Sequence, residues 1–276
     1  QGYSSAASDV YKRQVVMRDG TFQKSALTLL LRYTLAFLLI GLLWEAVSRA
    51  AGESLLPSPV TTALLFFQSL SDPVYIGHLV VSLKRLIYGL TAGAVPALFL
   101  GLLLGHLKKA DWLGAPLVYT TFPLPKIVLL PVFFLFLGLG DASRVLLIAL
   151  TTGYQMIVIV RAAALSLDPV YETAITCMGA GRWDRIRYVY LPAALPSFLT
   201  SLKVACGTAV AVLFLAESFA TTTGLGFLIM DAWGVGDTLA MFNGILGMSV
   251  IGLLLYAAVW LSEVVLTPWC RAVQLH

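Results

Sequence analysis

The sequence predicts an all-α integral membrane protein with six transmembrane helices. Hydrophobic residues make up 59% of the 276 residues and charged residues only 12%, whereas a soluble domain carries about 25% charged residues. The mean hydropathy is +0.89. The apolar residues gather in runs long enough to cross a bilayer, where only helices and closed barrels satisfy their own backbone. These runs are too long and too uniformly apolar to be barrel strands.

The predicted spans each hold about 20 mostly apolar residues, the length that crosses the hydrocarbon core. They cover residues 26–47, 83–105, 116–139, 144–165, 195–217 and 239–265. Residues 1–25 form an N-terminal tail, and residues 26–276 form one transmembrane domain. The opening QGYSSAASDVYKRQ resembles a translated sequencing adapter. We therefore expect these first residues to be non-native and exclude them from the fold.

Two segments differ from regular spans. Residues 48–77 contain LLPSPVTTALLFFQSL, which predicts a short helix that lies on the membrane rather than crossing it. The third span contains FPLPKIVLLP, in which Pro123 and Pro125 remove backbone donors and bend the helix. Irregular backbone at membrane depth is tolerated where it is buried in protein or lines a cavity. This stretch is therefore either a structural kink or part of the lining of a solute path.

Lys126 lies beside these prolines. A charged residue within a span is a candidate functional group, because burying one costs about 3 kcal/mol. Its ammonium group either attracts an anion in a solute path, or reaches the membrane surface, or pairs with a carboxylate of a neighbouring span.

Basic residues predict the orientation of the spans, since they collect in cytoplasmic loops. If the N-terminus is cytoplasmic, that side holds Arg18, Lys24, Lys108, Lys109, Arg161, Arg182, Arg185, Arg187 and Arg271. The opposite side then holds only Arg49, Lys84, Arg85 and Arg144. The sequence therefore predicts that both termini are cytoplasmic.

A polar stretch, DPVYETAITCMGAGRWDRIRYVYLP, follows the fourth span on the predicted cytoplasmic side. The Asp-Pro pair that begins at Asp168 predicts a helix start, with Glu172 in the first turns, where the helix dipole favours a negative charge. The GAG sequence permits a sharp turn that β-carbons would obstruct. Residues 183–189 predict a second short helix, which Pro192 ends. The two helices, within residues 168–190, would project from the membrane as an elbow.

This stretch resembles the EAA motif of binding-protein-dependent ABC importer permeases, the cytoplasmic coupling helices that insert into a cleft of an ATPase subunit. The residues that match its key positions are Glu172, Ala174, Gly179, Ala180, Leu191 and Pro192. The resemblance implies that they contact the ATPase, with Gly181, Arg182 and Arg185 beside them. Thr173 replaces an alanine of the motif, and Gly181 stands where serine is common and caps the second helix less well.

Three further stretches are similar to the nitrate, sulfonate and taurine branch of these permeases: SLKRLIYGL, LLPVFFLFLGLGDASRVLLIAL and AESFATTTGLGFLIMDAW. Relatives of that branch import vitamin precursors. The resemblance implies the MetI-like core shared by methionine and molybdate permeases, in a multi-pass protein of the bacterial inner membrane that imports such a small solute. Glu217 lies in the AES sequence, so we expect it, with Pro123, Pro125 and Lys126, near the substrate path.

The resemblance also implies partners. They are two ATPase subunits, a second copy of the chain, a periplasmic or lipid-anchored substrate-binding protein and membrane lipid, with no nucleic acid. The sequence has no Gly-Lys pair and hence no Walker A loop. We therefore expect a chain that is not an enzyme and has no cofactor of its own, with ATP and Mg²⁺ bound by the ATPase. The cysteines and histidines are too scattered to predict a metal site.

An ion-coupled secondary carrier or channel is the alternative function. Such a protein would show broken helices paired in two related halves, with ionisable groups near the middle of the membrane. The sequence predicts one broken span and has no internal repeat that we can identify. A membrane-embedded enzyme ranks third, because no nucleophile and base are paired in the sequence.

Overall fold

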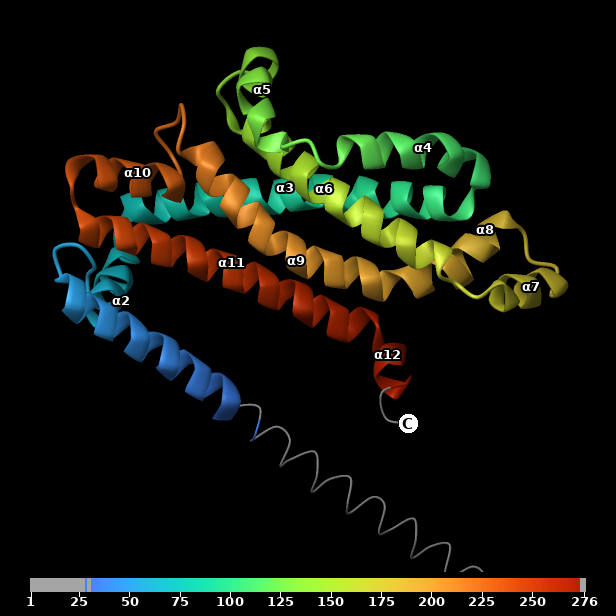
Figure 1. The fold of residues 1–276 in the computed structure, drawn as a ribbon, viewed down its shortest axis with the longest axis horizontal. Coiled ribbons are helices and arrows are strands. Elements are labelled where there is room, and N and C mark those ends of the chain that lie inside the picture. The colour runs from blue at the N-terminus through green and yellow to red at the C-terminus, as the bar shows by residue number, and fades with distance from the viewer. Residues whose placement is uncertain (1–27, 29–30, 274–276) are drawn as a thin grey trace, which may run out of the picture. The chain divides into compact units, whose positions relative to one another are not determined.

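A computed structural model describes residue 28 and residues 31–273 (Figure 1). The predicted tail at residues 1–25 and the start of the first predicted span lie outside the described residues. Each regular element that the structure describes is helical. The chain divides into two compact units, Gln1–Thr62 and Ala63–His276.

In the first unit, the helix Leu31–Ala51 provides the first predicted span. The chain after it folds back onto its end. The Ser48 hydroxyl donates to the carbonyl of Leu56 at 2.7 Å, and the Trp44 indole donates to the carbonyl of Pro57 at 3.0 Å. These bonds satisfy two carbonyls of the loop and hold it against the end of the helix.

The helices after this span are joined mostly by short turns. In chain order they are α2 (Pro59–Ser69), α3 (Pro73–His106), α4 (Lys108–Thr121), the 3₁₀ turn η1 (Lys126–Leu129), α5 (Leu130–Leu137), α6 (Asp141–Leu165), α7 (Pro169–Cys177), α8 (Arg182–Arg185), the π-helical turn η2 (Ile186–Tyr190), α9 (Leu191–Glu217), α10 (Leu225–Val235), α11 (Thr238–Leu266) and α12 (Pro268–Val273). Five helices of the described residues are long and apolar enough to cross a membrane, and α4 with α5 forms a bent sixth. Five of the predicted spans are thereby confirmed as helices, the third is a bent pair of helices, and α2 is the predicted short helix.

The second span begins about ten residues earlier than its apolar run predicts, at Pro73 instead of residue 83. Asp72 caps the helix, because its side chain accepts a hydrogen bond from the amide of Val74 at 2.9 Å, and a proline suits the first helical position. The extra turns carry Tyr75 and His78, whose polar groups hid them from a search for apolar runs.

The third span is broken at the predicted place. Helices Lys108–Thr121 and Lys126–Leu137 meet at an angle of 86°. Pro123 and Pro125 lie between them, where no helical hydrogen bond requires their missing donors.

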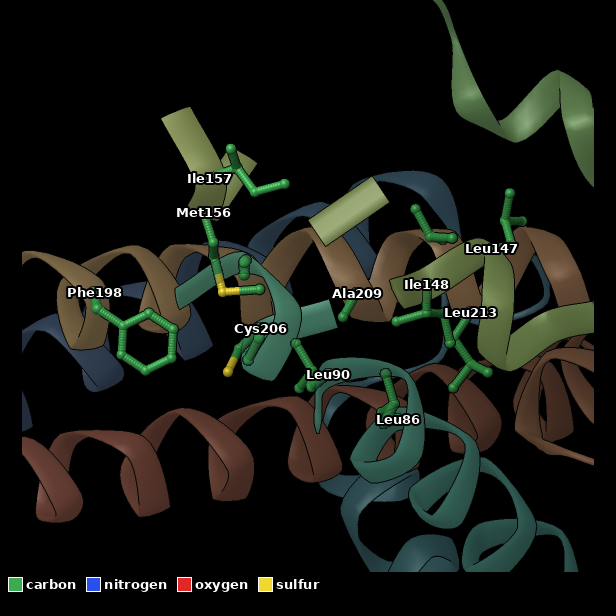
Figure 2. Close-up of a cluster of buried hydrophobic side chains, with 14 of the residues drawn as sticks. Leu86, Leu90, Leu147, Ile148, Met156, Ile157, Phe198, Cys206, Ala209 and Leu213 are labelled. Carbon is green, nitrogen blue, oxygen red and sulfur yellow. The ribbon is translucent and has the colours of Figure 1, made fainter. Parts of the chain in front are cut away.

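The buried core of the second unit lies where α3 packs on α6, and α6 on α9 (Figure 2). Small residues bring the first pair together, as is common between membrane helices. A β-carbon on Gly93 would lie 2.6 Å from the carbonyl oxygen of Ala149, and one on Gly101 would lie 2.7 Å from Val160. Only glycine fits at these two crossings. Helix α11 then packs against α9 and α10.

The two ends of this helix group differ (Figure 1). Helices α7 and α8 lie at one end, and α10 lies at the other. Residues 218–238 lie between the fifth and sixth predicted spans and were expected to form a loop, but α10 is an apolar helix of 11 residues within them. That length is too short to span a bilayer, and α10 packs instead on α9 and α11.

Candidate functional site

The first arm of the predicted elbow forms as its residues indicate. Asp168 accepts a hydrogen bond from the amide of Val170 at 2.9 Å and caps α7, with Pro169 at the first helical position. Helix α7 ends at Cys177, and Gly179 follows with a φ of +84°. A side chain is strained at such a φ, so the turn depends on this glycine.

The second arm begins just after the turn, with α8. Gly181 has no side chain to cap it, but the Asp184 carboxylate accepts a hydrogen bond from the Gly181 amide at 2.9 Å. This contact is one half of a capping box and compensates for the serine that the motif usually has. Arg182 begins α8, and its side chain lies outside the described residues.

The prediction that Pro192 ends the second arm is wrong. Residues Trp183–Glu217 form one helix of 35 residues, which passes through Pro192 into the fifth span. The π-helical turn η2 comes just before this proline, and the amide of Leu191 donates to the carbonyl of Ile186. This wider turn changes the hydrogen-bond register by one residue, which admits a residue without an N–H group.

Glu172 joins the two arms of the elbow. One carboxylate oxygen accepts a hydrogen bond from the Arg185 guanidinium at 2.8 Å, and the other accepts from the Tyr190 hydroxyl at 2.8 Å. Tyr190 is buried, and its ring packs edge-on against His106 at the end of α3, with centroids 4.3 Å apart. The charge-assisted bonds of Glu172 therefore hold α7 against the helix that enters the membrane.

A hollow of about 550 Å³ lies on the elbow and brings Ala174 of α7 near Pro192 of α9. Several large apolar or aromatic side chains around it are exposed: Tyr171, Met178, Tyr188 and Trp269. Met178 is 85% exposed. Where exposed apolar surface of this kind lies in water, it is typical of a protein-binding site. Gly179 is exposed, whereas Ala180 and Leu191 are half-buried.

Lys126 lies at the break in the third span, and its side chain turns back toward α4. The ammonium group donates to the carbonyls of Thr121, at 3.1 Å, and Phe122. It also lies 4.6 Å from the ring centroid of Tyr154. A cation is favourable at the C-terminal end of a helix, where carbonyls lack partners. No carboxylate of the described residues forms an ion pair with Lys126, and no contact joins it to Glu217.

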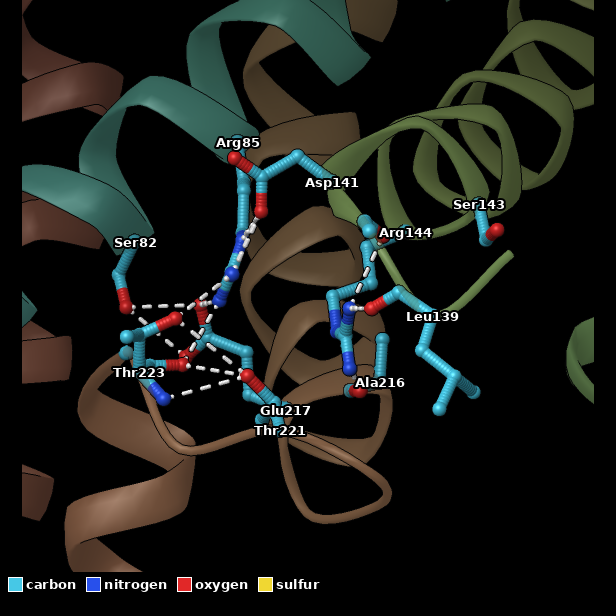
Figure 3. A network of polar contacts seen from close by, with 12 residues as sticks. Ser82, Arg85, Leu139, Asp141, Ser143, Arg144, Ala216, Glu217, Thr221 and Thr223 are labelled. Atoms are coloured by element: carbon cyan, nitrogen blue, oxygen red, sulfur yellow. Dashed lines mark hydrogen bonds and ion pairs between the residues drawn. The ribbon is translucent and has the colours of Figure 1, made fainter. Parts of the chain in front are cut away.

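Glu217 instead belongs to a polar cluster near α10, buried except at Asp141 and Thr223, which we call the arginine–carboxylate cluster: Ser82, Arg85, Asp141, Arg144, Glu217 and Thr223 (Figure 3). The Glu217 carboxylate is fully buried and pairs with Arg85 at 2.7 Å. It also accepts hydrogen bonds from Ser82 and from the amide of Gly226. Arg85 reaches further, to Asp141 at 2.6 Å, whose side chain is 64% exposed.

Arg144 has a different set of partners. Its N–H groups all donate to backbone carbonyls, those of Leu139, Gly140, Ala216, Phe219 and Ala220. Sequence reasoning placed Arg85 and Arg144 among the basic residues of the outer loops, but they are only 3% and 1% exposed. Their burial was missed because their partners come from elsewhere in the chain: Glu217 pairs with Arg85, and carbonyls as distant as that of Ala220 accept from Arg144. The sequence did contain one sign of this burial, because both arginines lie at the edge of apolar runs that were predicted to be spans.

The family model described as "Binding-protein-dependent transport system inner membrane component" matches residues 97–268. Among curated proteins, the chain is 30% identical to the putative aliphatic sulfonates transport permease protein SsuC of Bacillus subtilis (strain 168), over 82% of this chain and 83% of the relative. It is 30% identical to the taurine transport system permease protein TauC of Escherichia coli (strain K12), over 75% of each. The riboflavin transport system permease protein RibX of Chloroflexus aurantiacus is 31% identical, over 86% of this chain and 88% of the relative.

Solved structures of transporters share the fold. A chain of the MetNI methionine ABC transporter, in an inward-facing conformation, superimposes with a TM-score of 0.60 over 70% of this chain and 96% of that one, at 17% identity. A bacterial ABC transporter that imports alginate gives a TM-score of 0.55 over 72% of this chain and 82% of that one, at 15% identity. The predicted MetI-like fold is confirmed.

The arginine–carboxylate cluster gives a test of stability. We expect Glu217→Gln to lower the free energy of unfolding by about 3 kcal/mol, because it leaves the buried Arg85 charge short of a partner. Asp141→Asn is the matched control and should cost less than about 1 kcal/mol, because Asp141 is mostly exposed. The rate at which the buried Cys206 thiol becomes reactive on heating, with Cys177 and Cys270 replaced, measures both changes. Equal losses in the two variants would contradict a central role for Glu217.

Proposed function

The chain belongs to the family of binding-protein-dependent transport system inner membrane components, and we propose that it imports a small organic anion, with aliphatic sulfonates as the first candidates. As a member of this family it is a membrane subunit of an ABC importer, which works with an ATPase and a substrate-binding protein. The observation that carries the proposal is the family match across most of the spans, together with relatives named for sulfonates and taurine.

Lys126 supports an anionic solute. It is a cation at the break of a span, and no described carboxylate neutralises it. Its bonds to the end of α4 hold the ammonium group in place, and a fixed charge attracts an anion without a cost for reordering. Relatives named for riboflavin and formylaminopyrimidine transport make a vitamin precursor the second candidate.

The elbow, α7 to η2, is proposed to receive the ATPase. Its exposed apolar hollow, with Ala174 and Pro192, supplies the docking surface, and Arg182 and Arg185 of the second arm are proposed to contact the ATPase as well. Glu172 bonds both arms, so a force applied to α7 reaches α9 through the Arg185 and Tyr190 contacts. ATP and Mg²⁺ are bound, in this proposal, by the ATPase and not by this chain.

The proposed assembly has two permease chains and two ATPase subunits around a two-fold axis, in membrane lipid, with both termini in the cytoplasm. The single elbow of each chain supports one ATPase per permease. The basic residues at the elbow and around Lys108 support a cytoplasmic position for this end of the helices.

Cysteine labelling tests the orientation. We expect single cysteines at Ala180 and at Thr222, in a chain without native cysteines, to react from opposite sides of sealed vesicles, because the elbow and the α9–α10 loop lie at opposite ends. The mass of the purified complex should correspond to two permeases and two ATPases. Labelling from the same side, or an active complex with one permease, would refute this arrangement.

A glycine pair tests the elbow. Gly179→Val should reduce ATP-driven uptake by about tenfold or more, because a branched residue resists the positive φ. Gly181→Ala is the matched control, since its β-carbon meets nothing closer than 3.4 Å, and it should retain uptake. Uptake and co-purification of the ATPase are measured in both variants. Normal coupling in Gly179→Val would show that the ATPase does not act through this turn.

Reconstituted vesicles test the substrate. With its ATPase and binding protein, the chain should accumulate taurine and short alkanesulfonates only when ATP is present, and Lys126→Ala should slow this uptake several-fold. Nitrate, riboflavin and a formylaminopyrimidine serve as competing solutes. Uptake of riboflavin without any sulfonate uptake would assign the vitamin class instead. Uptake driven by an ion gradient without ATPase would support a secondary carrier.

A further inference from the structure

A cavity of about 590 Å³ lies where the end of α3 meets η2 and the start of α9. Its volume is within the range of about 300–1,000 Å³ for small-ligand sites. Apolar side chains form most of the wall, among them Phe99, Leu103 and Ile186. Phe99 is 64% exposed and Leu103 is 45% exposed. Both belong to the second predicted span, so the cavity opens beside a helix that we expect to lie in the membrane. An apolar cavity that opens there is accessible to lipid.

Basic residues lie in or next to the lining of the cavity, together with an exposed tryptophan. Arg187 lines it, and Leu107, another lining residue, is followed directly by Lys108 and Lys109. These three cations are exposed and form no ion pair with any described carboxylate. Trp183, 67% exposed, also lines the cavity. Tryptophan and basic side chains mark the level of lipid headgroups.

The inner wall contains a polar atom without a partner. His106 lines the cavity, and its Nδ1 is buried without a hydrogen-bond partner among the described residues. An occupant with an anionic group and a long apolar part would match both the basic residues and the apolar wall. A free inorganic anion would leave the apolar wall empty, and a zwitterionic lipid would bring a positive charge close to the cations.

We propose that this cavity binds one anionic phospholipid, with an acyl chain against α3 and the phosphate at Arg187 and the lysine pair. Basic pockets between transmembrane helices on the cytoplasmic side are known to hold anionic headgroups. If the proposed orientation holds, this lipid belongs to the cytoplasmic leaflet; the binding site itself is the same in either orientation. The site also adjoins the elbow, because Tyr190 lines the cavity and donates its hydroxyl proton to Glu172. The bound lipid therefore contacts one of the two residues that hold α7.

Native mass spectrometry of the permease purified with its ATPase tests the site. Phosphatidylglycerol and phosphatidylcholine with identical acyl chains are the probes. We expect tighter binding of phosphatidylglycerol, and Arg187→Gln should weaken it about fivefold with little effect on phosphatidylcholine, since each basic residue near a headgroup contributes about that much. Lys84→Gln, an exposed lysine near the other end of α3, is the matched control for lost charge. Equal binding of the two lipids would overturn the proposal.

A pair of leucine variants tests the apolar wall. Leu103→Trp fills the cavity and should remove the tightly bound phosphatidylglycerol, whereas Leu253→Trp, on the exposed side of α11, should not. If both variants bind lipid as the wild-type chain does, the cavity is not the site. Dissociation of the permease pair by Leu103→Trp, with lipid binding unchanged, would assign the cavity to the second copy. Because binding is measured without transport, its failure is distinct from a failure of the proposed function.

Discussion

Inside a bilayer no water is available for polar groups, so each interruption of a helix must be satisfied by the protein itself. The structure meets this constraint in three ways. Lys126 covers the carbonyls where α4 stops, Arg144 covers those of two loops, and a π-helical turn accommodates Pro192. Each device permits a bend or a loop that straight spans would lack. The break in the third span, the ordered α9–α10 loop and the helix that continues from the elbow all depend on them.

The sequence predicted the features that depend on neighbouring residues. Apolar runs located the spans, Asp168 located the start of α7, and the glycine at 179 located the turn. The features it missed depend on residues far apart in the chain. The burial of Arg85 follows from Glu217, which packing brings beside it, and α10 is stabilised by α9 and α11 rather than by its own length. The error at Pro192 has another cause, since its effect depends on the hydrogen-bond register of the preceding turn.

The elbow shows how a short motif gains a defined shape. Its glycine allows the turn but does not hold it, because glycine has the most backbone freedom to lose. Glu172 supplies the missing constraint through Arg185 and Tyr190, and Asp184 does the same for the Gly181 amide. In this chain both carboxylate oxygens of Glu172, the acidic residue of the motif, therefore form hydrogen bonds within the elbow. The surface left for a partner is the apolar one, around Met178 and Tyr188.

The continuous helix from Trp183 to Glu217 connects the elbow to the arginine–carboxylate cluster at the other end of the helix group. Its main part, α9, has 27 residues and is about 40 Å long at 1.5 Å per residue. A tilt of about 5° at the elbow would move its far end by about 3–4 Å over that length. That end carries Glu217, which is bonded to α3 through Ser82 and Arg85. A small rotation at the elbow would thus become, at the other end of α9, a displacement larger than a hydrogen bond can stretch.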